Sequence, residues 1–200
     1  NYAFGYYCNE ELDDALAKID GVTIFAKQDT VAQKYAEENE IAFINLSDYS
    51  DFFEYMVFED SYVSLISYTE CPYSDEIIIP SEIDGYEVRI IGDFLFENTN
   101  IKKVYIPASV TTVKLSAFEN VSEFTEFICE EGGRYSSVDG VLYRDNGEML
   151  VKVPEAKTEI NEIPENLKII RENAFRNSSV KTVELPETVE KIEEEQRARE

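Results

Sequence analysis

A pattern that recurs at a fixed interval constrains the fold of this chain more than any other feature. The pattern is an apolar-x-apolar-Pro run followed by apolar residues three, six and eleven positions after the proline. Pro164 and Pro186 are 22 residues apart (186 − 164), and Phe96 and Phe118 are also 22 apart (118 − 96). A fixed period of this length is typical of solenoids, in which each repeat contacts only its neighbours. We therefore predict stacked coils whose aliphatic and Phe side chains form shared columns, with Phe96, Phe118 and Phe175 in one of them.

The repeats differ in how closely they follow the pattern. The first copy carries a five-residue insert at 83–87, after which Ile91 and Phe96 return to register. Between the second and third regular copies lies an irregular unit, in which Phe127 and Cys129 keep the strand but a glutamate replaces the proline. The last copy has polar residues where Ala and Phe are expected, so it is either a solvated cap or a truncated repeat. The regular copies lie around four prolines: Pro80, Pro107, Pro164 and Pro186.

Two segments have the composition of β-hairpins. Residues 55–69 carry aromatic and β-branched residues on two arms around a turn at 59–61, and we expect this hairpin to cover the open edge of the sheet that follows. The alternation of apolar and polar residues at 137–154 predicts an inserted hairpin, with its turn at Asp145-Asn146-Gly147. Residues 46–54 are rich in Ser and Asp and are predicted to be a linker.

The first 45 residues read as a separate unit. We expect a short strand at 21–25, a helix at 31–39 after the capping residue Thr30, and a second strand at 41–44. Residues 9–18 have helical spacing, but a long loop fits them equally well. The chain starts at Asn1 without Met, and we interpret it as a fragment or a processed form.

Charge and cysteine content narrow the function classes. The formal net charge of −24 disfavours partners with a phosphate backbone and anionic membrane surfaces. No apolar run approaches the ~20 residues that span a bilayer. With three cysteines, neither a disulfide framework nor a zinc site is indicated; Cys129 is expected in the core, and Cys8 and Cys71 would pair only if distant segments met.

Catalytic chemistry finds little support in the sequence. The chain has no histidine, which removes the commonest general base and metal ligand, and it has no phosphate-binding glycine loop or nucleophile elbow. Acidic groups at 13–14, 75–76 and 145–148 could offer oxygen ligands to calcium, but their spacing does not match an EF-hand. We predict no enzyme activity and no cofactor.

Four stretches resemble the BspA-like leucine-rich repeat family. They are IIIPSEIDGYEVRIIGDFLFEN, VYIPASVTTVKLSAFEN, EIPENLKIIRENAFRN and the DGVLY hairpin. Residues 55–69 resemble the N-terminal hairpin of such proteins, and residues 1–45 resemble the unit that closes their arrays. The resemblance implies a leucine-rich repeat solenoid of short strands, inserted hairpins and one short helix. It also implies a C-terminal closing unit of a first array at 1–45, and a second array at 55–200.

The same resemblance implies a secreted or cell-surface bacterial protein that adheres to host or neighbouring-cell proteins without catalysis.

Alternate residues of each solenoid strand face the core, and those between them face the concave surface. The outward row predicted from this alternation is Ile78, Tyr105, Ile128 and Glu184, and an exposed Ile-Tyr-Ile stripe rimmed by charges has the composition of a contact surface. Packing of a hairpin over this stripe is the competing interpretation. The candidate binding residues are Ile78, Lys103, Tyr105, Glu126, Ile128 and Glu184.

A carbohydrate-binding module is the alternative function. The chain has 13 tyrosines and 12 phenylalanines but no tryptophan, and most phenylalanines occupy repeat positions. Exposed Tyr62, Tyr68 or Tyr105 would then stack on sugar rings. In either case we expect a monomer that binds no nucleic acid and does not insert into a membrane.

Overall fold

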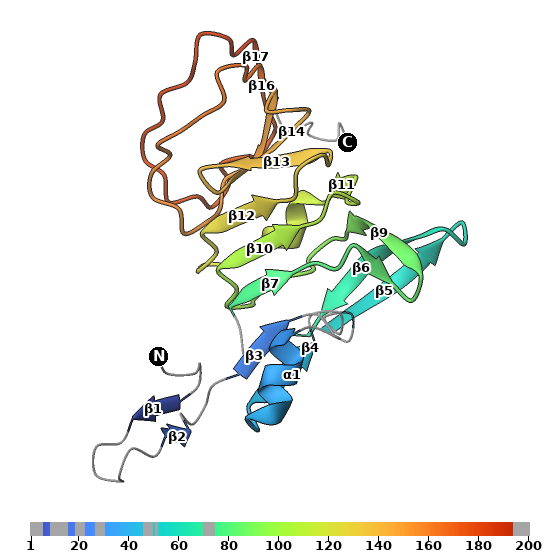
Figure 1. Cartoon of the computed structure of the whole chain (residues 1–200). Helices are drawn as coiled ribbons and strands as arrows, with labels where there is room; N and C mark the ends of the chain where they lie inside the picture. Colours follow the sequence, from blue (N-terminus) through green and yellow to red (C-terminus); the bar gives the residue numbers. More distant parts are fainter. Residues whose placement is uncertain are drawn as a thin grey trace. The chain divides into compact units, whose positions relative to one another are not determined.

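The computed structural model describes residues 6–8, 16–18, 23–26, 31–45, 50, 52–69 and 75–193 (Figure 1). The chain divides into two compact units, Asn1–Tyr49 and Ser50–Glu200. Within the described part of the chain, no helix is long and apolar enough to cross a bilayer.

The first unit contains two pairs of strands and a helix. Strands β1 (Tyr6–Cys8) and β2 (Leu16–Lys18) are antiparallel, so residues 16–18 belong neither to a helix nor to a loop. Strand β3 (Thr23–Ala26) and strand β4 (Ala42–Asn45) are parallel, and α1 (Val31–Glu38) connects and contacts both. The two strands and the helix predicted at 21–44 are confirmed, with boundaries shifted by one or two residues.

Three parallel strands form the first sheet of the second unit. They are β7 (Glu76–Ile78), β10 (Lys103–Ile106) and β12 (Glu126–Cys129), in the order β12-β10-β7, and each comes from a different repeat. Val104 pairs with Ile77 on one side and with Phe127 on the other, so equivalent repeat positions lie side by side. The register of the sheet therefore follows the predicted repeat.

The hairpin at the start of the repeats belongs to a second sheet. Strands β5 (Phe53–Phe58) and β6 (Tyr62–Tyr68) are antiparallel, and β6 pairs in parallel with β9 (Tyr86–Ile91). The order is β11-β9-β6-β5, with β8 (Glu82–Ile83) folded back on β9 and β11 at Thr112–Val113. The predicted hairpin is confirmed, but it extends this second sheet rather than the β7–β10–β12 sheet. It starts at Phe53, inside the predicted linker.

The insert has one strand more than the hairpin predicted at 137–154. It is a three-stranded meander of β13 (Tyr135–Val138), β14 (Val141–Arg144) and β15 (Met149–Lys152). Asp139 and Gly140 both have positive φ and form a first turn, which the sequence interpretation missed, while Asp145-Asn146-Gly147 forms the second turn as predicted. Strand β15 then pairs in parallel with β16 (Ile169–Ile170), which pairs with β17 (Lys191–Ile192).

Aromatic rings build the core of the regular coils. The ring centroids of Phe96 and Phe118 are 5.2 Å apart, and those of Phe118 and Phe124 are also 5.2 Å apart. These side chains are fully buried, and each contributes about 1.5–3 kcal/mol relative to exposure. The predicted column of Phe96, Phe118 and Phe175 is therefore only partly right. Phe124 takes the place next to Phe118, and Phe175 packs against a cluster around Tyr143 instead.

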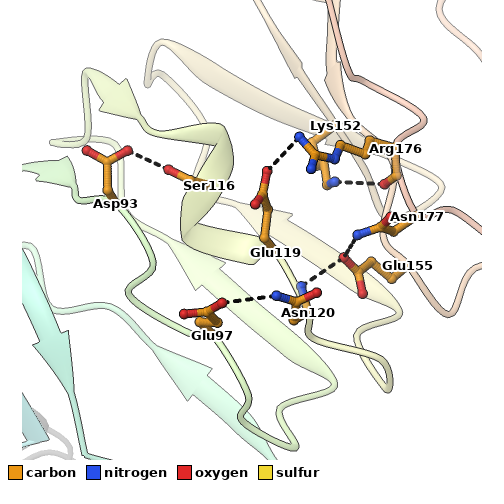
Figure 2. Close-up of polar contacts among 9 residues, drawn as sticks. All are labelled: Asp93, Glu97, Ser116, Glu119, Asn120, Lys152, Glu155, Arg176 and Asn177. Atoms are coloured by element: carbon orange, nitrogen blue, oxygen red, sulfur yellow. Dashed lines mark hydrogen bonds and ion pairs between the residues drawn. The ribbon is translucent and has the colours of Figure 1, made fainter.

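A polar network ties the coils together beside the insert (Figure 2). Asn120 donates its backbone N–H to the Glu155 carboxylate at 3.1 Å, and Asn177 donates its side-chain amide to the same oxygen at 3.1 Å. Lys152 is buried and donates to the Arg176 carbonyl at 3.0 Å. Burial lowers the pKa of Lys152, and the nearby Glu155 carboxylate opposes that shift. The two buried members of this network, Lys152 and Glu155, both have hydrogen-bond partners, which indicates a structural role.

Candidate functional site

The outward residues of β7, β10 and β12 form one continuous surface, which we call the strand face. The strand face comprises Glu76, Ile78, Lys103, Tyr105, Glu126 and Ile128. Its members alternate with the buried residues of the same strands, because successive side chains of a strand point to opposite sides. Register places Ile78, Tyr105 and Ile128 in one row and Glu76, Lys103 and Glu126 in the next. The structure thus brings five of the six candidate residues together, along with Glu76.

The charged row of the strand face is a chain of ion pairs. Lys103 Nζ lies 3.1 Å from Glu76 Oε1 and 3.6 Å from Glu126 Oε2. Hydrogen bonding and the charge of Glu76 raise the pKa of Lys103, so the ammonium is stabilised between two carboxylates. Tyr105 donates its hydroxyl to Glu76 Oε2 at 3.3 Å, and burial together with the Glu76 charge raises the pKa of its phenol. The row is pre-ordered and leaves one negative charge in excess.

The apolar row opens into a cleft of about 240 Å³. Ile78, Tyr105 and Ile128 line it, with Pro107 and Cys129 at one end. All five side chains are half-buried, so the cleft retains apolar surface that the protein's own core does not use. Such a hollow fits apolar side chains of a partner.

A larger and more polar hollow of about 550 Å³ adjoins this cleft at Ile128. Asp139 and Lys157 line it, and Lys157 Nζ lies 3.3 Å from Asp139 Oδ1. Burial raises the pKa of Asp139, but hydrogen bonds from the Asn161 N–H at 2.7 Å and from Lys157 outweigh it and lower the pKa overall. The Asp139 carboxylate is therefore ionised, and the Lys157 ammonium balances its charge within the hollow.

Glu184 does not belong to the strand face. The β12-β10-β7 sheet ends at β12, and β13 and β14 of the insert contact β12. Glu184 is exposed and lines a separate hollow of about 660 Å³ formed by parts of the segments at 158–165 and 182–186. Leu185 and Val183 occupy the two apolar positions of the repeat before Pro186, which the alternation assigns to the core, yet Leu185 is exposed and Val183 is half-buried. The insert interrupts the ladder, so the repeat pattern alone misplaced this coil.

The tyrosines considered for sugar stacking lie apart. Tyr105 is in the β7–β10–β12 sheet, whereas Tyr62 and Tyr68 are in the sheet of the hairpin. Tyr62 stacks on Phe58 with ring centroids 5.7 Å apart, and Tyr68 packs against Phe53 at 5.2 Å. The three rings therefore do not form one platform.

Groups with reactive chemistry are sparse in the described part of the chain. Among these residues no three His, Cys, Asp or Glu side chains gather as metal ligands would. Burial raises the pKa of the Cys129 thiol to about 12, so it is protonated at neutral pH and is a poor nucleophile. Two of the acids considered for calcium are paired with cations: Asp75 with Lys102 at 2.8 Å and Asp145 with Arg144 at 3.0 Å. The possible pairing of Cys8 with Cys71 lies outside the described residues, as does the chain after residue 193.

The family model of the BspA type leucine rich repeat region matches residues 49–139 and 155–196, in 6 copies. This chain belongs to that family. The match is interrupted at residues 140–154, which contain the hairpin of β14 and β15. Family membership suggests a protein that takes part in protein–protein interaction or lies at the cell surface, and leucine-rich repeats of this kind are typically non-catalytic.

Three solved structures illustrate the similarity. A leucine-rich repeat protein from Eubacterium ventriosum shares 25% identity over 58% of this chain and 31% of its own, with a TM-score of 0.49. The pneumococcal vaccine antigen PcpA shares 30% identity over 55% of this chain and 28% of its own, with a TM-score of 0.47. A leucine rich cell surface protein from Faecalibacterium prausnitzii shares 18% identity over 70% and 48%, with a TM-score of 0.43. The chain thus spans less than a third of the first two proteins. No curated protein matches its sequence.

Proposed function

We propose that the strand face is the binding surface of a non-catalytic adhesion module in a bacterial surface or secreted protein. The partners in this proposal are proteins on host or neighbouring cells. The support comes from the family, from the net charge of −24 that disfavours nucleic-acid partners, and from the geometry of the strand face.

The apolar cleft between Ile78, Tyr105 and Ile128 is the observation that carries this proposal. Parallel sheets are normally covered on both faces. Here one face packs on the phenylalanine core, while the other keeps a half-buried apolar row beside a paired row of charges. A partner that places apolar side chains in the cleft would bury the remaining surface, and the charged row would fix its orientation.

Charge substitution in the cleft tests this proposal. We expect Tyr105→Glu and Ile128→Glu to reduce the binding of fluorescently labelled protein to host or bacterial cells, measured by flow cytometry, by roughly tenfold or more, because an unpaired charge would be buried at the contact. Ile192→Glu is the matched control, since Ile192 is 63% exposed on β17 and outside the strand face. Circular dichroism melts verify that all three variants fold.

Two results would contradict the proposal. Undiminished binding by both cleft variants would exclude the strand face, and an equal loss in the Ile192→Glu control would indicate a non-specific charge effect. A glycan array separates the carbohydrate alternative: array binding that is lost on changing Tyr62, Tyr68 or Tyr105 to Ala would identify a sugar ligand instead of a protein.

A further inference from the structure

Strand β5 is the outermost strand of the hairpin sheet. The order β11-β9-β6-β5 leaves β5 with β6 on one side, and no strand follows it among the residues the structure describes (Figure 1). An edge strand of six residues presents backbone N–H and C=O groups to which another extended chain can add. This edge belongs to a different sheet from the strand face, so the inference is independent of the proposed function.

The hydrogen bonds of the hairpin determine which backbone groups face outward. The Phe52 carbonyl accepts the Thr69 N–H at 2.8 Å, and the Phe58 carbonyl accepts the Ser61 N–H at 3.0 Å. Both carbonyls therefore point toward the β6 side. Because the backbone groups of successive strand residues point to opposite sides, the N–H and C=O groups of Tyr55 and Val57 point to the free edge.

Apolar side chains surround these outward backbone groups. Met56, Val57 and Phe58 are 52%, 39% and 37% exposed. The strand FEYMVF contains none of the lysine or proline residues that natural proteins use to block an edge. Val57 lies on the same side of the sheet as its partner Val63, and Met56 and Phe58 lie on the other side. An added strand would thus find apolar contacts on both of its faces.

The charges near the edge are acidic. Glu54 precedes the apolar residues, Glu59 and Asp60 follow them, and Asp84 accepts a hydrogen bond from the Tyr55 hydroxyl. The sequence has no lysine or arginine between Lys34 and Arg89. Arg89 itself is paired with Glu87, and its guanidinium carbon lies 5.2 Å above the Tyr62 ring. A second copy of the chain would bring like charges together, whereas a basic strand would complement them.

We propose that β5 is a docking edge for an extended segment of a partner protein that alternates apolar residues with lysine or arginine. The segment adds as a strand beside β5, hydrogen-bonds to the backbone of Tyr55 and Val57, and packs its apolar residues against Val57 on one side of the sheet. Its basic residues lie on the other side, where their alkyl stems cover Met56 and Phe58 and their charged groups lie near Glu54, Glu59 and Asp60.

A synthetic peptide provides a direct test with the full chain. The probe is acetyl-Lys-Val-Lys-Trp-Lys-Val-Lys-amide, whose Trp fluorescence reports binding because the chain contains no tryptophan. We expect saturable binding that weakens as NaCl rises, and no binding of the same peptide with Glu in place of Lys. Val57→Lys should weaken binding by roughly tenfold or more, since it puts a like charge at the edge. Ile192→Lys is the matched control and should bind as the unaltered chain does.

Amide hydrogen exchange measured by NMR supplies a second, position-specific readout. We expect the peptide to slow exchange at Tyr55 and Val57, while Met56 and Phe58, whose amides already face β6, change little. Three results would overturn the proposal: equal binding by Val57→Lys, equal weakening by Ile192→Lys, or protection confined to residues outside β5. Sedimentation velocity tests the remaining alternative, because a dimer that Val57→Lys dissociates would make a second copy the occupant.

Discussion

Cys129 shows how the repeat pattern places a single side chain. It pairs in register with Ile106, and it lines the apolar cleft of the strand face while remaining half-buried. Burial raises the pKa of its thiol to about 12, although a hydrogen bond with Ser137 opposes the shift. The expectation that Cys129 lies in the core is thus right for its position in the strand, but not for complete burial.

Cys129 should react slowly with iodoacetamide at pH 8 in the folded chain, and rapidly in urea, as measured by mass spectrometry of the peptide that contains it. The reason is that the thiolate is the nucleophile, and little of it forms when the pKa is about 12. Because the folded pKa is above the unfolded value of roughly 8.5, the stabilisation from this thiol is complete below pH 8.5 and declines as pH rises toward 12. Cys129→Ser should remove that part of the alkaline decline. Fast alkylation of Cys129 at pH 8 without urea would contradict the prediction.

At the scale of elements, the turns between coils depend on asparagine and on Glu155. Asn98, Asn120 and Asn177 have φ near +60°, a conformation that Asn adopts more easily than most residues. The Asn98 N–H donates to the Asn120 carbonyl of the next coil at 3.3 Å. The Asn120 N–H instead donates to the Glu155 side chain, since the insert displaces the coil that would offer a carbonyl there. Glu155, which is 7% exposed, joins the regular coils to the last ones.

Glu155→Ala should lower the free energy of unfolding by about 1–3 kcal/mol in urea titrations, because two partly buried hydrogen bonds to a charged acceptor would be lost. Glu155→Gln keeps an acceptor oxygen and should lose less. Glu97→Ala is the control, since Glu97 accepts from Asn120 at the surface at 3.0 Å and its loss should cost about 0.5 kcal/mol or less. Equal losses for Glu155→Ala and Glu97→Ala would refute the joining role.

For the whole molecule, net charge opposes compaction. The chain has 42 acidic and 18 basic residues, so even complete pairing leaves 24 acidic groups without a cation (42 − 18). Repulsion among such groups destabilises the compact state, and salt screens it over about 8 Å at physiological ionic strength. Surface ion pairs are weakened by the same salt, but each contributes only about 0–1 kcal/mol.

Raising NaCl from 20 mM to 0.5 M should therefore increase the melting temperature of the repeat unit, by about 2–4 °C for each kcal/mol of repulsion removed. Scanning calorimetry at pH 7 measures this shift, and KCl should give the same result if screening is the cause. A melting temperature that falls with salt would show that the ion pairs outweigh the repulsion.

Much of the fold follows from local pattern. The recurring strand pattern, aligned across its five-residue insert, and the alternation of apolar residues were enough to predict that Ile78, Tyr105 and Ile128 share one row, and the register confirms it. The helix at Val31–Glu38 and the turn at Glu59-Asp60 were also readable, because periodicity and turn chemistry are properties of short segments.

The tertiary structure alone decided which strands lie next to one another. Asp139-Gly140 has turn chemistry, yet only the pairing of β13 with β14 shows that the insert has three strands. Glu184 lies outside the strand face, and Phe175 lies outside the phenylalanine column, because the insert interrupts the stack of coils between them and the regular repeats. The free edge at β5 and the Glu155 bridge depend in the same way on groups far apart in sequence. The repeat determines which apolar side chains and backbone groups each coil presents. Long-range hydrogen bonding and packing determine which of these groups are paired or buried within the fold and which stay accessible to a partner.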